Sequence, residues 1–282
     1  MPFISIIVAT RNVSSYLGHC LESLGAQTFR DFEVIIQDAL SEDGTPAMAE
    51  GMRDALPRLT LESTRDAGLY DAWNKAVAKA SGEWVLFLGA DDRLADASVL
   101  DDMAASARNV GEDVEYISGS VLRVDASGGI VAHDAADPHK VMARMPGCMA
   151  LPHPGLFHRR RLFAANAFDL AYRIAGDYDF LARTLRPHNF ICVDRLVTRM
   201  QVGGMSGNVL GLWDSEVECL RASRRHYPSA VPWLLLFRLC RSGVFRLCSR
   251  VLPRSWLPYL ADGYRVLTGR RPLWTKMEGP RP

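Results

Sequence analysis

The chain has 282 residues, of which 48% are hydrophobic and 23% are charged, as is typical of a folded globular protein. No apolar run approaches the ~20 residues that span a bilayer, and the apolar start lacks the basic n-region of a secretory signal. The six cysteines include no C-x-x-C pair, so we expect reduced thiols in a cytoplasmic protein rather than disulfides or a zinc site.

The net charge of +1 conceals two oppositely charged parts of the chain. Thirteen Lys/Arg and two Asp/Glu lie between Cys219 and the C-terminus, a net charge of +11. The remaining residues carry 20 Lys/Arg and 30 Asp/Glu, a net charge of −10. Such a difference in charge between the two parts of the chain indicates that the basic tail contacts something other than what the acidic body contacts.

Strand and helix patterns alternate over the first third of the chain. Helical spacing predicts helices at 14–27, 46–56 and 68–80, and we expect Ser14 or Ser15 to cap the first of them. Short apolar runs predict strands at 3–10, 32–39, 59–63 and 83–88. This alternation predicts an α/β fold with a Rossmann-like, mostly parallel sheet flanked by helices, in which ligands bind beyond the carboxyl ends of the strands.

The next part of the chain is less regular. The pattern predicts a β-hairpin at 114–134 that turns at 127–129, and mostly loop at 142–163 that then enters a short basic helix. A turn at 176–179 precedes a predicted helix, a last strand is predicted at 190–194, and a glycine-rich loop at 200–208. We therefore expect an α/β domain over residues 1–210 and a basic, helical C-terminal region over 211–282.

The predicted strand at 83–88 runs into two adjacent acids, Asp91 and Asp92. Such a pair is unfavourable, because like charges repel and burial removes their water. A divalent cation on a nucleotide diphosphate would offset this, since carboxylate oxygens suit Mg²⁺ or Mn²⁺. The alternative is a polar turn that begins the next helix.

Polar residues also follow two other predicted strands. Thr10, Arg11 and Asn12 stand where nucleotide-binding loops of other folds carry glycines, and their side chains can hydrogen-bond a base or a ribose. Asp38 can accept a hydrogen bond from either, or it can be a turn acid before Ser41. The chain lacks both G-x-x-x-x-G-K-[ST] and G-x-G-x-x-G after the first strand, which argues against a P-loop NTPase and an ordinary dehydrogenase.

Four blocks of this sequence resemble the family 2 glycosyltransferases with the GT-A fold, in the same order and spacing over about residues 3–206. They are "SIIVATRN", "VIIQDALSEDGT", "RDAGLYDAWNKAVAKASGEWVLFLGADD" and "GDYDFLAR". The third looks like the branch that includes bacterial enzymes of polysaccharide and O-antigen assembly. The resemblance implies inverting, metal-dependent transfer of a sugar from a nucleotide-sugar, by default a UDP-sugar, to a hydroxyl of a glycan or lipid-linked acceptor.

The resemblance also implies roles for individual residues. Asp91 and Asp92 would hold Mn²⁺ or Mg²⁺, and Asp177 would be the base that deprotonates the acceptor. Asp179 is the competing base, but its place in the first turn of the predicted helix also suits a helix N-terminus. His153 stands where this branch often carries a histidine near the donor or acceptor, and Tyr70 and Asp179 are further candidate contacts. The nucleotide-sugar would be held by Thr10, Arg11, Asn12, Asp38, Asp66, Asn74, Lys75 and Asp91.

Two departures from the family pattern carry meaning. Gly89 replaces the first acid of the common Asp-x-Asp-Asp, so ribose contact would come from elsewhere. The Gln-x-x-Arg-Trp element of processive synthases is absent from the sequence, which indicates transfer of one sugar at a time. We expect Trp73 and Trp84 to fill the core rather than stack on a sugar, and His153 has the alternative of a packed loop histidine.

Two other classes of function compete with this interpretation. A catalytically silent GT-A-like binding or scaffold protein would have no chemical need for Asp91, Asp92 and Asp177 together. A nucleotidyltransferase would be expected to carry a glycine-rich basic loop after its first strand, and this sequence has none.

The basic tail contains a predicted amphipathic helix at 231–251. Basic residues opposite Trp, Phe and Leu are typical of a helix that lies in a membrane interface. We therefore expect a peripheral protein at the inner face of the membrane, close to a lipid-linked acceptor. Packing on the α/β domain or on a second subunit is the alternative, and nucleic acid is not expected, since no recognised motif is present. The apolar stripe comprises Trp233, Leu236, Phe237, Cys240, Val244, Leu247 and Val251, and Arg238, Arg241, Arg246 and Arg250 lie mostly opposite.

Overall fold

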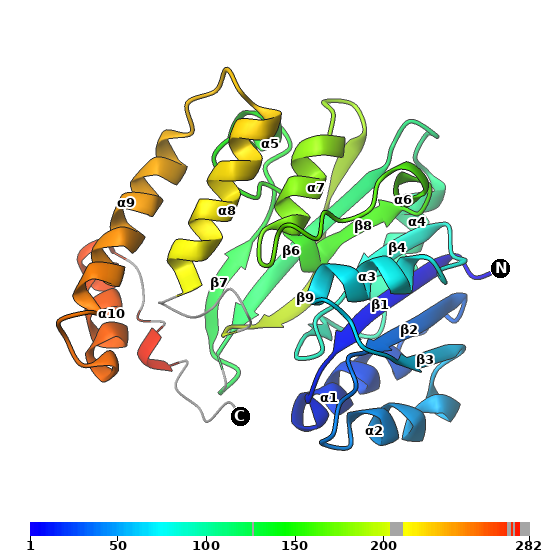
Figure 1. The fold of residues 1–282 in the computed structure, drawn as a ribbon. Coiled ribbons are helices and arrows are strands. Elements are labelled where there is room, and N and C mark those ends of the chain that lie inside the picture. The colour runs from blue at the N-terminus through cyan, green and yellow to red at the C-terminus, as the bar shows by residue number, and fades with distance from the viewer. Residues whose placement is uncertain (126, 204–210, 270–271, 273, 277–282) are drawn as a thin grey trace.

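One nine-stranded sheet forms the centre of the molecule (Figure 1). The computed structural model describes residues 1–125, 127–203, 211–269, 272 and 274–276. The strand order is β3-β2-β1-β4-β8-β6-β9-β5, and β7 pairs with β6. The strands are β1 (Ile4–Thr10), β2 (Phe32–Asp38), β3 (Leu59–Ser63), β4 (Trp84–Phe87), β5 (Arg93–Leu94), β6 (Tyr116–Val124), β7 (Ile130–Asp134), β8 (Leu156–Arg159) and β9 (Phe190–Gln201).

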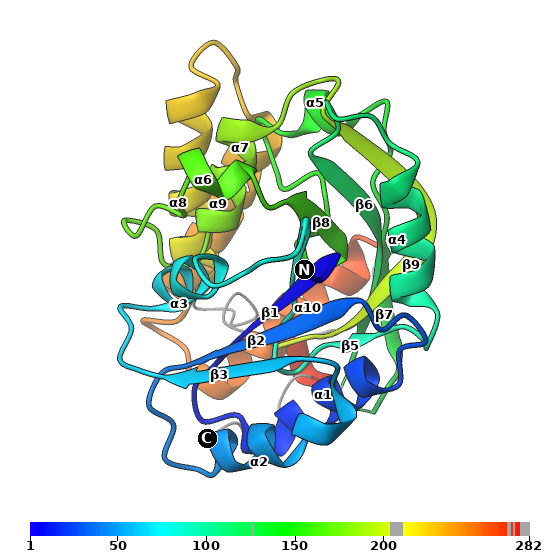
Figure 2. The ribbon, with the colours of Figure 1, turned by 90° about the vertical axis from the view of Figure 1, so that its right-hand side faces the viewer.

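Helices cover both faces of this sheet. Alternate strand residues point to opposite faces, so Ile6 packs in the cluster that contains α1 and α4, while Ile7 packs in the cluster that contains α3 and α7. In Figure 2, α3, α6 and α7 lie on the left of the sheet and α4 on the right. The α-helices are α1 (Ser14–Gly25), α2 (Thr45–Gly51), α3 (Leu69–Val77), α4 (Val99–Arg108), α5 (Val141–Arg144), α6 (Leu162–Ala165), α7 (Gly176–Thr184), α8 (Gly211–His226), α9 (Trp233–Cys248) and α10 (Leu257–Leu267).

The predicted α/β architecture is confirmed, and parallel pairing joins the first four strands and also β6 to β9. Strands β1 to β4 pair in parallel, and the β6–β7 hairpin turns as predicted. The prediction of loop over 142–163 is wrong at β8, which lies antiparallel between β4 and β6. Strand β9 is longer than predicted and ends at Gln201, and the predicted loop over 200–208 lies outside the described residues beyond residue 203.

The start of α1 also differs from the prediction, because neither Ser14 nor Ser15 caps it. Val13 is the N-cap residue, without a side-chain cap of its own. Instead, the N–H of Val13 donates to Thr45 Oγ1 and that of Ser14 donates to Asp43 Oδ2, each at 2.9 Å. The loop after β2 therefore fixes the β1–α1 turn.

Helix α8 packs on α7, and α9 packs on α8 (Figure 1). Ala222 of α8 is buried in the same cluster as Phe180 of α7, so α8 shares a core with the sheet. The predicted division at residue 210 stays a prediction, and it does not coincide with a break in packing. Trp213 of α8 lies against Gly243 of α9, where an added Cβ would meet its ring at 2.7 Å.

The arginine side of α9 faces α8, and its apolar stripe faces outward. Arg238 pairs with Glu216 at 2.9 Å, and Arg246 pairs with Asp214 at 3.1 Å. The alternative in which the stripe packs on the α/β domain is therefore wrong. Helix α10 adds further exposed apolar residues, among them Tyr259, Leu260 and Leu267. The exposed fractions along the stripe are 75% for Trp233, 58% for Phe237, 60% for Val244, 62% for Leu247 and 81% for Val251.

Among the described residues, no helix combines the length and the apolar character needed to pass through a bilayer.

Candidate active site

Asp38 holds three strand ends together at the carboxyl edge of the sheet. Its side chain is fully buried and accepts hydrogen bonds from Thr10 Oγ1 (2.9 Å), Ser63 Oγ (2.6 Å) and both the N–H (2.9 Å) and Oγ (2.5 Å) of Ser41. Burial acts to raise the pKa of Asp38, but the hydrogen bonds from Ser41, Ser63 and Thr10 outweigh it and lower the pKa. The hydrogen-bonding capacity of the Asp38 carboxylate is thus used within the protein, where it holds the carboxyl edge of the sheet together.

Arg11 and Asn12 are the exposed residues of the β1–α1 turn. Asn12 has a left-handed backbone with φ of 51°, accepts from the N–H of Glu42 at 2.9 Å, and donates its own N–H to Ser41 Oγ at 2.8 Å. The Arg11 guanidinium and the Asn12 carboxamide therefore lie at the surface beside the sheet edge, and the carboxamide oxygen of Asn12 is already engaged by Glu42.

Asp91 and Asp92 converge on Gly89 at the end of β4. A Cβ added to Gly89 would lie 2.8 Å from Asp92 Oδ2 and 3.1 Å from Asp91 Oδ1, so the two carboxylates share the space that a side chain would fill. Asp92 is buried and accepts from the N–H groups of Gly89 and Gln201, each at 3.2 Å. Burial, followed by the charge of Asp91, raises the pKa of Asp92 to about 8.

This pair fits a divalent cation bound together with phosphate oxygens. Two hard oxygen ligands approach one point, and a nearby positive charge would favour the ionised form of the buried carboxylate. Among the described residues there is no group of three or more His, Cys, Asp or Glu that would hold a metal alone. Phosphate oxygens of a donor would therefore complete the shell.

Three of the predicted donor-binding residues lie at or near α3 and are bonded within the protein. Asp66 precedes the helix, and Asn74 and Lys75 belong to it. Asp66 Oδ1 accepts from the N–H of Gly68 at 3.0 Å, and Lys75 Nζ bonds the Arg65 carbonyl at 2.7 Å and pairs with Asp71 at 2.9 Å. The Asn74 amide exchanges two hydrogen bonds with the Phe168 backbone, at 3.0 and 2.9 Å. In this structure Asn74 thus joins α3 to the 166–168 segment, and its carboxamide is already engaged there.

Asp177 lies in the first turn of α7 and contacts Tyr70 of α3. Its Oδ1 accepts from the Tyr178 N–H at 2.8 Å and lies 3.3 Å from the Tyr70 hydroxyl, which also donates to the Ile174 carbonyl at 2.6 Å. Burial, followed by the charge of Asp177, raises the pKa of Tyr70, so the phenol stays protonated. Asp177 is thus a half-buried carboxylate whose hydrogen bonds within the protein are few.

His153 is buried beside this pair, and its Nε2 has no hydrogen-bond partner. Its ring stacks on Trp73 at a centroid distance of 5.1 Å. Burial lowers the pKa of His153 against the opposing effect of the Asp177 charge, so the imidazole is neutral. Trp73 and Trp84 fill the core as predicted.

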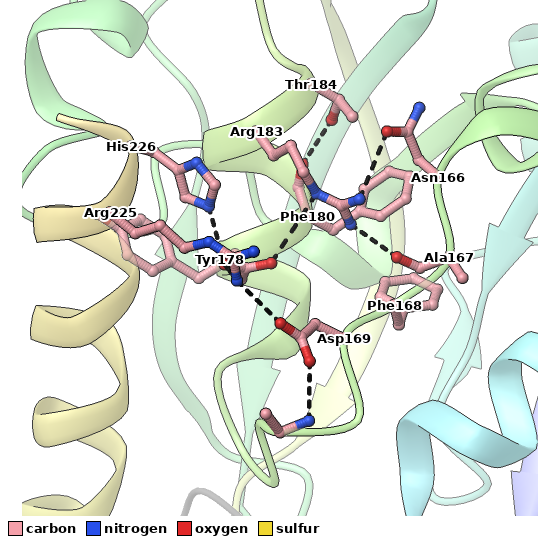
Figure 3. A network of polar contacts seen from close by, with 12 residues as sticks. Asn166, Ala167, Phe168, Asp169, Tyr178, Phe180, Arg183, Thr184, Arg225 and His226 are labelled. Carbon is pink, nitrogen blue, oxygen red and sulfur yellow. Dashed lines mark hydrogen bonds and ion pairs between the residues drawn. The ribbon is translucent and has the colours of Figure 1, made fainter.

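Asp179 pairs with residues of α8. It is 1% exposed, and its Oδ1 lies 2.9 Å from His226 Nε2 and 3.9 Å from Arg225. Figure 3 shows the surrounding network, in which Arg225 also bonds Asp169 at 2.9 Å. Helix α7 begins one residue before Asp177, so both acids lie in its first turn and burial is what separates them.

A chain of ring contacts runs from Tyr70, which lies beside Asp177, to the last residue of β4. Tyr70 lies 5.4 Å from Trp73, and Trp73 lies 4.7 Å from Phe87, as centroid distances. Phe87 is the last residue of β4, two positions before Gly89. The structure thus brings Asp177, Tyr70, His153 and the end of β4 together, while Asp38, Asn74 and Asp179 are engaged within the protein. The sequence-based prediction missed Glu218, which accepts three backbone hydrogen bonds just before Asp177.

Comparison with solved structures defines the fold. The fold resembles S. aureus TarS 1–349 in complex with UDP, with a TM-score of 0.60 and 20% identity over 92% of this chain and 78% of that chain. It also resembles a mannosyltransferase from Pyrobaculum calidifontis in complex with GDP-Man and Mn²⁺, with a TM-score of 0.61 and 18% identity over 95% and 81% of the two chains. The fold is therefore the GT-A fold of nucleotide-sugar glycosyltransferases.

Sequence comparison then gives the family. Residues 5–127 match the model of glycosyl transferase family 2. A PGL/p-HBAD biosynthesis glycosyltransferase of Mycobacterium tuberculosis is 36% identical over 189 residues, which cover 64% of this chain and 69% of that relative. The chain belongs to glycosyl transferase family 2 and is a glycosyltransferase, so the nucleotidyltransferase alternative is not retained.

Proposed function

We propose that this enzyme transfers one sugar, with inversion, from a nucleotide-sugar to an acceptor hydroxyl, in a reaction that depends on a divalent metal. The observation that carries this proposal is the convergence of Asp91 and Asp92 on Gly89, with Asp177 at the opposite end of a continuous row of rings. An inverting transfer needs two things, a base for the acceptor and stabilisation of the leaving diphosphate. Asp177 would supply the base, and the metal held by Asp91 and Asp92 would stabilise the diphosphate.

In this proposal Asp177 takes the proton of the acceptor hydroxyl as that oxygen attacks the anomeric carbon. The Tyr70 hydroxyl, 3.3 Å away, helps to orient the carboxylate. Asp91 and Asp92 would hold Mn²⁺ or Mg²⁺, which supplies Lewis-acid stabilisation of the diphosphate when bound. Arg11, Asn12, Asp66 and Lys75 are the proposed contacts of the nucleotide-sugar, and Thr10 and Asp38 shape the edge on which it rests.

The proposed donor is a UDP-sugar, and the proposed acceptor is a glycan or a lipid-linked glycan used in cell-surface polysaccharide assembly. The mycobacterial relative, named for PGL/p-HBAD biosynthesis, supports a cell-surface role by likeness. Likeness of fold supports a nucleotide-sugar donor, since TarS was solved with UDP-GlcNAc and the Pyrobaculum mannosyltransferase with GDP-Man, and we choose UDP as the default nucleotide.

A thermal-shift screen of nucleotide-sugars, with and without Mn²⁺, tests the donor. A ligand that binds only the native state adds about 2.7 kcal/mol of stability at a hundredfold excess over its dissociation constant. We expect a UDP-sugar to raise the melting temperature only when Mn²⁺ is present. A donor whose effect does not change with Mn²⁺ would contradict the metal role, and a response to another nucleotide-sugar but to no UDP-sugar would contradict the proposed donor.

We also propose that α9 and α10 place the enzyme on the inner face of an anionic membrane. The outward stripe of α9 leaves Trp233, Phe237 and Leu247 mostly exposed, within a segment of net charge +11. Basic residues near an anionic surface each contribute about 1 kcal/mol, and large apolar side chains about 1.5–3 kcal/mol when fully buried. Such a docked enzyme would meet a lipid-linked acceptor.

Replacing the outward stripe is therefore expected to weaken binding to vesicles that contain phosphatidylglycerol. The variant Trp233→Ser/Phe237→Ser/Leu247→Ser should bind at least tenfold more weakly, as measured by cosedimentation. Binding of the parent should fall as salt rises, since the Debye length is only about 8 Å at physiological ionic strength.

The matched control removes three exposed apolar side chains from other surfaces, Ile130→Ser/Leu170→Ser/Val217→Ser. It should bind vesicles like the parent. A parent that ignores anionic vesicles at low salt would rule the membrane out, and a dimer that the stripe variant dissociates would identify a subunit interface instead.

A further inference from the structure

We propose that Glu218 of α8 is a positioning residue for Asp177, a role that rests on the proposed function of Asp177 as the base. Glu218 lies 41 residues further along the chain, on a helix that follows the predicted end of the α/β domain. Through this residue α8 bonds directly to the backbone just before Asp177.

The carboxylate of Glu218 binds three consecutive backbone N–H groups. Oε2 accepts from Ile174 at 2.8 Å and Ala175 at 2.9 Å, and the N–H of Arg173 lies 3.1 Å from both oxygens. Successive N–H groups that point the same way form a concave anion site. Here the anion in that site is the Glu218 side chain of α8. The contact therefore ties the conformation of residues 173–175 to α8.

Tyr70 holds the same segment from the opposite side. Its hydroxyl donates to the Ile174 carbonyl at 2.6 Å, and its ring lies against Gly176, where an added Cβ would meet ring carbons at 2.7 to 2.8 Å. The peptide before Asp177 is therefore fixed by Glu218 at its N–H groups and by Tyr70 at its carbonyl.

Helix α7 does not provide this constraint itself. Its N-cap residue, Ala175, has no side chain that can accept a hydrogen bond, and no side-chain cap is present. Without Glu218 the three N–H groups would have to hydrogen-bond to water instead. The first turn of α7 would then be conformationally more mobile. Because a reacting group displaced by about 1 Å can lose about 10²-fold in rate, such freedom acts on the transfer step.

Glu218→Ala is expected to lower kcat by about ten- to hundredfold while the dissociation constant of the nucleotide-sugar changes less than about twofold. Glu218→Gln should retain most of the rate, because its carbonyl oxygen can take the place of Oε2. The matched control Asp214→Ala removes the same charge from an exposed site on the same helix and should leave kcat unchanged. Each rate is measured well below the melting temperature of the variant, so that unfolding does not contribute.

A double-mutant cycle with Asp177→Asn separates positioning from general stabilisation. If Glu218 acts through Asp177, Glu218→Ala should cost little further rate in the Asp177→Asn background. A full additional loss there would overturn the proposal, as would a single Glu218→Ala variant with normal kcat. An active Asp177→Asn enzyme would instead refute the base assignment, so the two failures are distinguishable.

Discussion

Asp177→Asn is expected to slow sugar transfer by at least about 10²-fold, the contribution typical of a positioned general base. Asparagine has the size of aspartate and its amide oxygen still accepts from the Tyr178 N–H, but it cannot take a proton from the acceptor. The nucleotide-sugar should therefore bind as before. Measurement of kcat at saturating acceptor, beside calorimetric titration of the donor, checks both parts of this expectation.

The neighbouring acid provides the control. Asp179 is 1% exposed and lies within 2.9 to 4.0 Å of His226, Arg225 and Arg183, so Asp179→Asn should lower the melting temperature. Its effect on kcat should be far smaller than that of Asp177→Asn. The reverse order of the two effects would exchange the roles of the acids.

Asp92→Asn is expected to abolish detectable transfer while the fold is retained. The carboxamide keeps the size of the side chain but removes the charge that, with Asp91, would hold the metal. EDTA should inactivate the parent enzyme in the same way, and added Mn²⁺ should restore the parent but not the variant. Asp91→Asn should behave similarly, since both carboxylates meet at Gly89.

Asp96→Asn serves as the control for the metal site. It removes one acid four residues further on, from a half-exposed side chain that pairs with Arg195. This variant should keep its activity and its response to EDTA. Full activity of the parent in EDTA would refute the metal role and favour a cationic side chain on the diphosphate.

The part of the fold that could be predicted is the part with local signals. Strands β1, β2 and β4 are short and mostly apolar. Strand β1 ends at Thr10 and β2 at Asp38, and Asp91 and Asp92 follow β4, so parallel pairing brings these polar residues to one edge of the sheet. Strand β8 has no such signal. It is four residues long, ends in His158 and Arg159, and is a strand only because β4 and β6 pair with it from both sides.

The residues of the candidate site could likewise be predicted only where their role depends on local sequence. That Asp38 ends a strand is visible in the sequence, but its four donors come from β1, β3 and the following loop, and their assembly depends on the folded edge. Asn74 and Lys75 share a helix with Tyr70, yet only the packing of the 166–168 segment shows that the amide of Asn74 is engaged. Glu218 contacts residues more than forty positions earlier, and a contact of that range leaves no periodic trace.

The close fit of Trp213 against Gly243 fixes the rotation of α9 about its own axis. A helix in water would normally turn its apolar side toward the protein, but here that rotation would separate Arg238 from Glu216 and Arg246 from Asp214. It would also drive a side chain with a Cβ into the indole where glycine now allows contact. The exposed apolar stripe therefore has a direction relative to the sheet that is fixed by the packing of α9 on α8.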